Sequence, residues 1–143
     1  MREFLERLED LLMENNMSKN QLSKAIGVRP DTIYGYYRKD LMPEISIAIR
    51  ISNLFNCSLD YLFGLSDFLN NDDVNDLTFS DTIKKLIKDS NNSVEKTMKE
   101  LGISDRTYYR WQTGESKPQT SLILIIAKYF DVSIDYLVSE YKK

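Results

Sequence analysis

The chain has 143 residues, of which 42% are hydrophobic and 29% are charged, and it carries a formal net charge of −3. This composition is ordinary for a globular protein of one domain or two very small ones, and the net acidity argues against indiscriminate binding to polyanions. The sequence has no histidine and one cysteine, which excludes histidine-based catalytic triads, histidine-based metal sites and an internal disulfide.

The N-terminal half is predicted to form about five short helices. The first has the apolar spacing of one helical face, given by Phe4, Leu8, Leu11 and Leu12. Ser18 is suited to cap a second helix, which is expected to end at Gly27. A third helix follows at once, Pro43 is expected to open a fourth, and SLDYL at residues 58–62 forms the last turn. No segment alternates with a period of two, so strands are not expected.

The same series of elements recurs 75 residues later. An ungapped alignment of residues 4–64 with residues 79–139 contains 16 identical pairs among 61, where about four are expected by chance. The identical pairs include Ser18/Ser93, Gly27/Gly102, Thr32/Thr107, Tyr34/Tyr109 and Pro43/Pro118. We therefore predict two copies of one unit, residues 1–65 and 78–143, joined by an acidic linker over residues 66–77.

Each copy carries one ordered pattern of residues. A serine is followed by Leu or Thr, by Ile-Gly-Val or Leu-Gly-Ile, and then by a threonine, an aromatic residue, a proline and SxDYL. Two helices joined through a glycine describe the helix-turn-helix, and the whole pattern resembles the Cro/lambda-repressor-like (XRE-type) helix-turn-helix family. The resemblance covers about 60 residues twice and implies an all-α fold of two tandem five-helix bundles of the lambda-repressor-like DNA-binding type.

The resemblance also implies a function and a partner. It implies a sequence-specific DNA-binding transcriptional regulator, and within that class a repressor, whose partner is double-stranded DNA. In the family the second helix of the motif enters the major groove, while the first helix braces against the DNA backbone. The loop that follows runs along that backbone.

In the second copy, a helix over residues 105–113 separates an apolar side, with Tyr108 and Trp111, from a basic and polar side. Arginine is well shaped for guanine O6 and N7 or for a phosphate, and the free N–H groups at a helix start can hold a phosphate. The DNA-binding residues expected in this copy are Ser93, Ser104, Asp105, Arg106, Thr107, Tyr109, Arg110, Thr113 and Lys117.

The corresponding face of the first copy is less suited to DNA. Asp31 repels phosphate, although it can accept a hydrogen bond from cytosine N4, and Gly35 has no side chain. Lys39 stands where the second copy has Gly114 and the family usually has glycine. The candidates in this copy are Arg29, Asp31, Thr32, Tyr34, Arg38 and Lys39. The alternative is a dimerisation or partner-binding module, so that the chain acts as an antirepressor or antitoxin-like protein with little DNA contact.

The segment SLILIIAKYF, residues 121–130, is more apolar than a surface helix requires. Beyond its core face it carries a second apolar stripe. The residues of this stripe are Leu122, Ile125 and Tyr129, and the first copy has Ile47 and Leu54 in the corresponding region. We expect the stripe to pack against the other copy or against a second chain in a homodimer, or to be partly covered by the linker.

Several functions are not expected from this sequence. No apolar run approaches the ~18 residues of a membrane helix, and the acidic, amphipathic N-terminus is unlike a signal peptide. We expect a cytoplasmic protein in which Cys57 is a buried small apolar residue. A nucleophile with its base and a glycine-rich phosphate loop are both missing, so we expect no enzyme activity, no small-molecule substrate, no cofactor and no metal.

Overall fold

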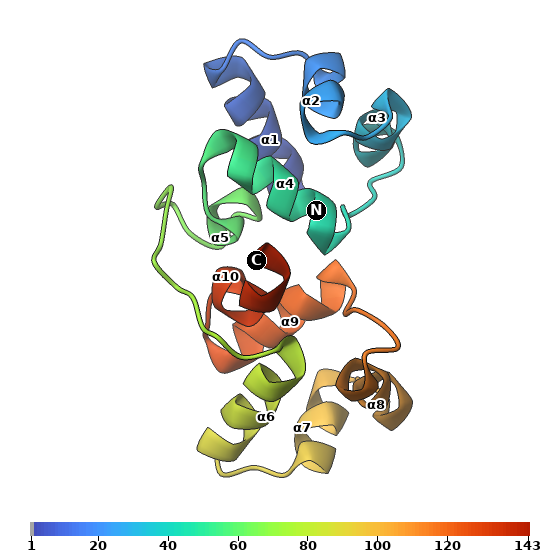
Figure 1. The fold of residues 1–143 in the computed structure, drawn as a ribbon, viewed down its shortest axis with the longest axis vertical. Coiled ribbons are helices and arrows are strands. Elements are labelled where there is room, and N and C mark those ends of the chain that lie inside the picture. The colour runs from blue at the N-terminus through green and yellow to red at the C-terminus, as the bar shows by residue number, and fades with distance from the viewer. Residues whose placement is uncertain (1) are drawn as a thin grey trace. The chain divides into compact units, whose positions relative to one another are not determined.

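The computed structural model describes residues 2–143, which fold into two compact units that divide between Asp72 and Asp73 (Figure 1). Within residues 2–72 the first unit has five α-helices: α1 (Arg2–Glu14), α2 (Lys19–Ile26), α3 (Pro30–Arg38), α4 (Ile45–Phe55) and α5 (Leu59–Leu62). Within residues 73–143 the second unit has five more and a final 3₁₀ turn: α6 (Phe79–Asp89), α7 (Val94–Leu101), α8 (Asp105–Thr113), α9 (Thr120–Phe130), α10 (Ile134–Leu137) and η1 (Ser139–Lys142). Neither range contains a strand, so the predicted all-α fold of two tandem five-helix bundles is confirmed.

Capping residues fix where α2 and α7 begin and end. The Ser18 hydroxyl accepts a hydrogen bond from the Gln21 N–H at 3.1 Å, and the Gln21 side chain accepts one from the Ser18 N–H at 2.8 Å. Ser93 caps α7 with its hydroxyl, which accepts a hydrogen bond from the Lys96 N–H at 3.1 Å, but Lys96 stands where α2 has Gln21 and the reciprocal side-chain bond is not formed. Both helices end at a left-handed glycine, Gly27 with φ 76° and Gly102 with φ 72°, as the sequence predicts.

The prediction that a proline opens the fourth helix of each copy is wrong. The N-cap of α4 is Glu44 and that of α9 is Gln119, so Pro43 and Pro118 lie just before the helices. Both prolines are buried. A proline ring restricts its own φ angle and keeps the preceding residue extended, so these prolines fix the loop that leads into each helix.

An aromatic pair joins the first and third helices of each unit. Phe4 of α1 packs edge-to-face on Tyr36 of α3, with ring centroids 5.8 Å apart. Phe79 of α6 packs in the same manner on Trp111 of α8, at 5.4 Å. All four side chains are buried. Because the two pairs occupy equivalent positions, the same contact fixes the rotation of α3 and of α8 about their own axes.

Residues that follow the last short helix secure the first helix of each unit. In the second unit, the Phe79 N–H donates to Glu140 Oε1 at 2.9 Å, and the Tyr141 ring stacks on Phe79 with centroids 6.4 Å apart. Burial, and then the Glu140 carboxylate, raises the pKa of Tyr141 to about 12, so its phenol stays neutral at physiological pH. In the first unit, Arg7 Nη2 lies 2.8 Å from Asp67 Oδ1.

The segment predicted as an acidic linker, residues 66–77, contains the division between the units and contributes contacts on both sides of it. In the first unit, the Ser58 N–H donates to the Leu69 carbonyl at 2.8 Å. In the second unit, the Asn75 side chain donates to the Tyr136 carbonyl at 2.7 Å. These bonds tie parts of the segment to the bundle beside them.

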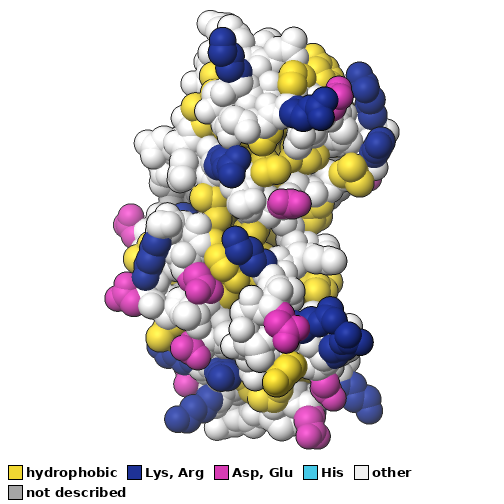
Figure 2. Space-filling model, turned by 45° about the vertical axis from the view of Figure 1, so that its right-hand side comes forward, with side chains coloured by type: hydrophobic (Ala, Val, Ile, Leu, Met, Phe, Trp, Pro, Cys, Tyr) yellow, Lys and Arg dark blue, Asp and Glu magenta, His cyan; other side chains and the backbone are white. Residues whose placement is uncertain are grey.

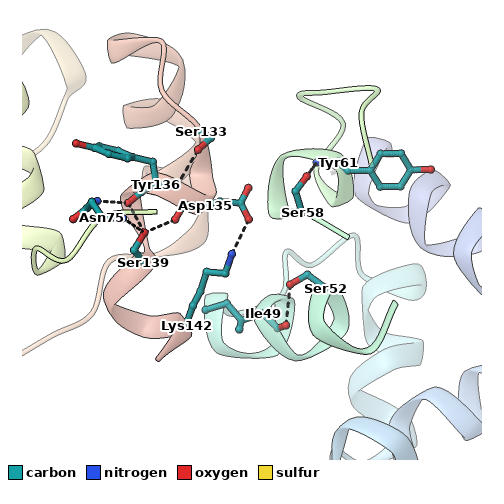
Figure 3. A network of polar contacts seen from close by, with 10 residues as sticks. All are labelled: Ile49, Ser52, Ser58, Tyr61, Asn75, Ser133, Asp135, Tyr136, Ser139 and Lys142. Atoms are coloured by element: carbon teal, nitrogen blue, oxygen red, sulfur yellow. Dashed lines mark hydrogen bonds and ion pairs between the residues drawn. The ribbon is translucent and has the colours of Figure 1, made fainter. Parts of the chain in front are cut away.

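A polar network surrounds α10 in the second unit (Figure 3). The Ser139 hydroxyl accepts a hydrogen bond from the Asn75 N–H at 3.1 Å and donates to the Asp135 carbonyl at 2.9 Å. The Asp135 carboxylate is buried, and its Oδ1 accepts a hydrogen bond from Lys142 Nζ at 3.1 Å. A buried carboxylate requires such a partner, so Lys142 anchors the C-terminal turn.

Trp111→Ala should lower the free energy of unfolding by about 3–5 kcal/mol, because it removes the indole that packs on Phe79 and leaves a cavity. Tyr109→Ala is the matched control, since Tyr109 lies on the same helix but is 60% exposed. The control should change stability by less than about 0.5 kcal/mol. Urea titration of the full chain, followed by circular dichroism, measures both. An unchanged midpoint for Trp111→Ala would contradict the packing.

Asn75→Ala should destabilise the second unit by about 1–2 kcal/mol, because it removes the side-chain donor to the Tyr136 carbonyl. Asp76→Ala should leave the unfolding midpoint unchanged. Asp76 is fully exposed, and its ion pair with Lys143, at 3.7 Å, lies on the surface, where such pairs contribute little to stability. Thermal unfolding of both variants distinguishes an anchored residue from a solvated one. Equal midpoints for the two variants would show that Asn75 does not anchor the segment.

Candidate nucleic-acid interface

Helices α7 and α8 form the helix-turn-helix of the second unit. The turn between them, residues 102–104, begins with the left-handed Gly102. Ile103 is buried, and its N–H donates to the Met98 carbonyl at 2.9 Å. Ser104 then caps α8. The buried isoleucine holds the turn against the bundle, so α8 starts at a fixed place relative to α7.

The α8 helix has one buried side and one exposed side. Trp111 and Tyr108 are each only 7% exposed, as the sequence predicts for the apolar side. Tyr109 is 60% exposed, and Arg106 is exposed as well. Because Trp111 is fixed by its contact with Phe79, the helical repeat directs Arg106 and Tyr109 away from the core.

Hydroxyl groups cap the start of α8. The Thr107 N–H donates to Ser104 Oγ at 3.1 Å, and the two side-chain hydroxyls lie 2.9 Å apart in a hydrogen bond. Asp105 is exposed in the first turn. The Ser104 hydroxyl, which the sequence assigns to a phosphate, therefore already accepts a hydrogen bond from the helix itself.

The chain that follows α8 turns back and contacts Arg110 in the last turn of the helix. Gly114 has φ 79°, and the chain after it returns so that the Ser116 N–H donates to the Arg110 carbonyl at 3.4 Å. Glu115 Oε2 then lies 3.8 Å from Arg110 Nε, which leaves the Arg110 side chain 43% exposed. The exposed Thr113 donates to the same carbonyl at 3.3 Å. Arg110 is thus less free than Arg106.

Lys117, in the loop after α8, lies over an aromatic ring. Its Nζ is 5.4 Å from the centroid of Tyr141, the ring that stacks on Phe79. The lysine itself is exposed. This contact links the loop to the C-terminal turn and keeps a positive charge near the end of α8. Ser93, the other residue assigned to DNA, is exposed at the start of α7, where its Oγ accepts the Lys96 N–H at 3.1 Å.

The ends of α3 in the first unit differ from those of α8. Arg29 is the N-cap and makes no side-chain capping hydrogen bond, and the helix starts with Pro30. Lys39 has φ −112°, so it does not take the left-handed conformation of Gly114. The left-handed residue is instead Asp40, with φ 49°. Asp31, Arg29, Arg38 and Lys39 are exposed, and Thr32 and Tyr34 are half-buried.

The positively charged side chains of Lys19 and Arg38, near α3, contact aromatic rings and a carboxylate of the first unit itself. Lys19 Nζ lies 4.1 Å from the centroid of the Tyr37 ring, 5.6 Å from that of Tyr34 and 3.7 Å from Glu9 Oε1. Arg38 also lies over Tyr34, at 5.4 Å. Burial, and then Glu9, raises the pKa of Tyr37. The positive charge of Lys19 is therefore compensated by cation–π contacts with these rings and by an ion pair with Glu9.

A shallow groove of about 680 Å³ opens beside this cluster. It runs from the end of α1 across the start of α2 to Tyr34 of α3. Its lining includes Glu9, Met13, Met17, Lys19, Gln21 and Tyr34. Of these six residues, sequence reasoning identified only Tyr34 as a candidate. The available signal was the 75-residue repeat, which pairs Glu9 with Lys84 and Met13 with Lys88.

The apolar stripe predicted on α9 is partly exposed. Ile125 is 44% exposed and Tyr129 is 40% exposed, whereas Leu122 is half-buried. The Tyr129 hydroxyl donates a short hydrogen bond to Glu100 Oε2. At the position of Ile125 the first unit has Arg50, which donates to the Ile26 carbonyl at 3.3 Å. In that unit Ile47 is half-buried and Leu54 is partly exposed.

Basic and acidic side chains are interspersed on the face of the molecule drawn in Figure 2. On this face charge alone does not mark a nucleic-acid surface, and the local faces of α3 and α8 are more informative. None of the helices formed by residues 2–143 has the length and apolar character that a membrane crossing requires.

Comparison with known proteins gives two matches to one family. A helix-turn-helix family model matches residues 8–62 and again residues 83–137. Over 64 residues the chain is 27% identical to an uncharacterized HTH-type transcriptional regulator, YobD, of Bacillus subtilis (strain 168), which covers 45% of this chain and 57% of that protein. Over 57 residues it is 28% identical to an uncharacterized HTH-type transcriptional regulator of Archaeoglobus fulgidus, which covers 40% of this chain and 80% of that protein. No solved structure matches the chain significantly.

The chain thus spans little more than half the length of the Bacillus relative. The family match, in contrast, includes α2 and α3 in one copy and α7 and α8 in the other. Because the family model covers most of the chain, this protein belongs to the helix-turn-helix family of the XRE/lambda-repressor-like type and carries two tandem copies of its domain.

Proposed function

We propose that the protein is a sequence-specific DNA-binding transcriptional regulator, and within that class a repressor, that inserts α8 into the major groove. The single observation that carries the proposal is the division of α8 into a buried side with Trp111 and an exposed side with Arg106 and Tyr109. The family and the names of two relatives support a DNA-binding transcription regulator as the broader class. The reducing cytoplasm is the compartment that we propose for it.

Both arginines of α8 are candidates for base contacts in this proposal. Arg106 is exposed near the helix start, where a side chain can reach a base edge, and its guanidinium suits guanine O6 and N7. Arg110 lies one turn further along α8, and its guanidinium forms an ion pair with Glu115. The first turn of α8 has backbone N–H groups besides the capped Thr107 N–H, and N–H groups at a helix start favour a phosphate. Phosphate contacts make the affinity fall as salt increases.

For the first unit we propose a second candidate function, the binding of a protein partner. Lys19 and Arg38 lie against Tyr34, Asp31 is acidic on the exposed side, and Gly35 offers no side chain for a base contact. These features favour a protein surface over a DNA surface on α3. An isolated first unit that binds duplex DNA as well as an isolated second unit would exclude this assignment.

We also propose that two chains pair through the α9 stripe, so that two second units read two half-sites. In a helix-turn-helix dimer the two motifs lie about 34 Å apart along the DNA. The exposed Ile125 and Tyr129 support the proposal, because exposed apolar side chains grouped on one helix face commonly mark a contact.

Arg106→Ala and Arg110→Ala should each weaken binding to the preferred duplex by about 1–3 kcal/mol if each makes a bidentate base contact. The preferred duplex is selected from random oligonucleotides with the purified protein, and fluorescence anisotropy gives the affinities. Lys128→Ala is the control, since Lys128 is exposed on α9, outside the helix-turn-helix. Unchanged binding by the double arginine variant would refute the role of α8.

Ile125→Glu should reduce the mass of the assembled protein in sedimentation, because a carboxylate in an apolar contact is costly to bury. The variant should retain its helical circular dichroism, since Ile125 is already 44% exposed in a single chain. Lys128→Glu, on the same helix, serves as the matched control. If parent and Ile125→Glu have the same mass at every concentration, the α9 stripe does not mediate pairing.

A further inference from the structure

The groove of the first unit and the equivalent surface of the second unit differ in charge. In the first unit, Glu9, Met13 and Gln21 line the groove together with Tyr34 of α3. The 75-residue repeat places a lysine at each of the first three positions in the second unit. These lysines are Lys84, Lys88 and Lys96, and the counterpart of Tyr34 is Tyr109.

The equivalence depends on shared anchors at both ends of the surface. Leu12 of α1 and its counterpart Ile87 of α6 are both buried, so the two helices have the same rotation relative to their own bundles. The Ser18 and Ser93 hydroxyls each accept a hydrogen bond from the N–H three residues further on, which belongs to Gln21 in α2 and to Lys96 in α7. Lys84, Lys88 and Lys96 each lie within about one helical turn of one of these anchors, so their side chains leave the helices in the same directions as those of Glu9, Met13 and Gln21.

The three lysines are available for an outside partner. Lys84, Lys88 and Lys96 are all exposed. Among residues 2–143, none of the salt bridges involves any of the three. In the first unit the same surface has Glu9, which forms an ion pair with Lys19. The second unit thus presents unpaired positive charge where the first unit does not.

We propose that Lys84, Lys88 and Lys96 form a phosphate-binding margin beside α8 and contact the sugar–phosphate backbone of double-stranded DNA. The inference rests on the proposed function, because it needs α8 to bring this side of the unit to the duplex. Tyr34 belongs to the groove in the first unit, so Tyr109, which is exposed on α8, borders the margin in the second. Lysine supplies a compact charge suited to a phosphate rather than to a particular base.

The margin assigns unequal roles to the two units. Each lysine that neutralises a phosphate releases a counterion and adds to the salt dependence of binding without adding sequence preference. Lysines of the margin therefore raise affinity for any duplex, while Arg106 supplies preference. The first unit lacks the margin because the counterpart of Lys84 is an acid and that of Lys88 is a methionine.

Lys85 provides a matched control for the margin. It is exposed on α6, next to Lys84, and has the same charge. Its counterpart in the first unit is Asp10, which does not line the groove. If the lysines of α6 merely solvate the surface or set the net charge, then Lys85 and Lys88 are interchangeable.

The experiment measures the salt dependence of DNA binding by the full chain. The variants are Lys84→Gln, Lys88→Met, Lys96→Gln, their triple combination and the control Lys85→Gln. Each is titrated against the preferred duplex and a scrambled duplex at several salt concentrations. Each margin variant should reduce the magnitude of the slope of log K against log salt by about 0.9, and the triple variant by about 2.7. The ratio of the two affinities should stay constant, and Lys85→Gln should match the parent.

The outcomes separate failure of the margin from failure of the proposed function. A triple variant with the parental slope, or a Lys85→Gln slope reduced as much as that of Lys88→Met, would overturn the margin. If Arg106→Ala still weakens binding to the preferred duplex in that case, the proposed function stands. A parent that binds neither duplex would overturn both. Equal thermal unfolding midpoints establish that a changed slope does not come from unfolding.

Discussion

The contact between Trp111 and Phe79 decides which residues α8 presents to a partner. With the indole held edge-to-face against Phe79, the helical repeat leaves Arg106 and Tyr109 on the exposed side. Phe79 is itself held in place by the C-terminal turn, because its N–H donates to Glu140 and its ring stacks on Tyr141. The orientation of the proposed recognition helix therefore depends on the last turn of the chain as well as on the helix-turn-helix.

The first unit repeats this packing without repeating the surface that it supports. Phe4 and Tyr36 form the equivalent edge-to-face pair, so α3 is held in the same rotation as α8. Its exposed side nevertheless carries Asp31 where α8 carries Arg106. A buried aromatic contact constrains only the inward side of a helix, and the outward side of each copy is free to change without loss of stability. Two units of one fold can thus serve different partners.

Local rules account for most of what the sequence predicted. The helices, the caps at Ser18 and Ser93 and the glycine stops depend on neighbours within one turn, and the family pattern adds the pairing of α7 with α8. The position of Lys19 over the Tyr34 and Tyr37 rings and the anchoring of Asn75 depend on residues distant in sequence. Pro43 was misplaced because proline suits both a first helical turn and the extended residue before a cap.

A net charge of −3 is compatible with a DNA-binding surface, because charges in water act over about 8 Å at physiological salt. In the second unit two acidic side chains accept hydrogen bonds from groups of the same unit. Asp135 is buried beside Lys142, and Glu140 accepts the Phe79 N–H. The lysines of α6, by contrast, are exposed and take part in none of the ion pairs formed within residues 2–143. A phosphate near α6 and α8 responds to those exposed charges, so the sum over the chain is a poor guide to the potential at this site.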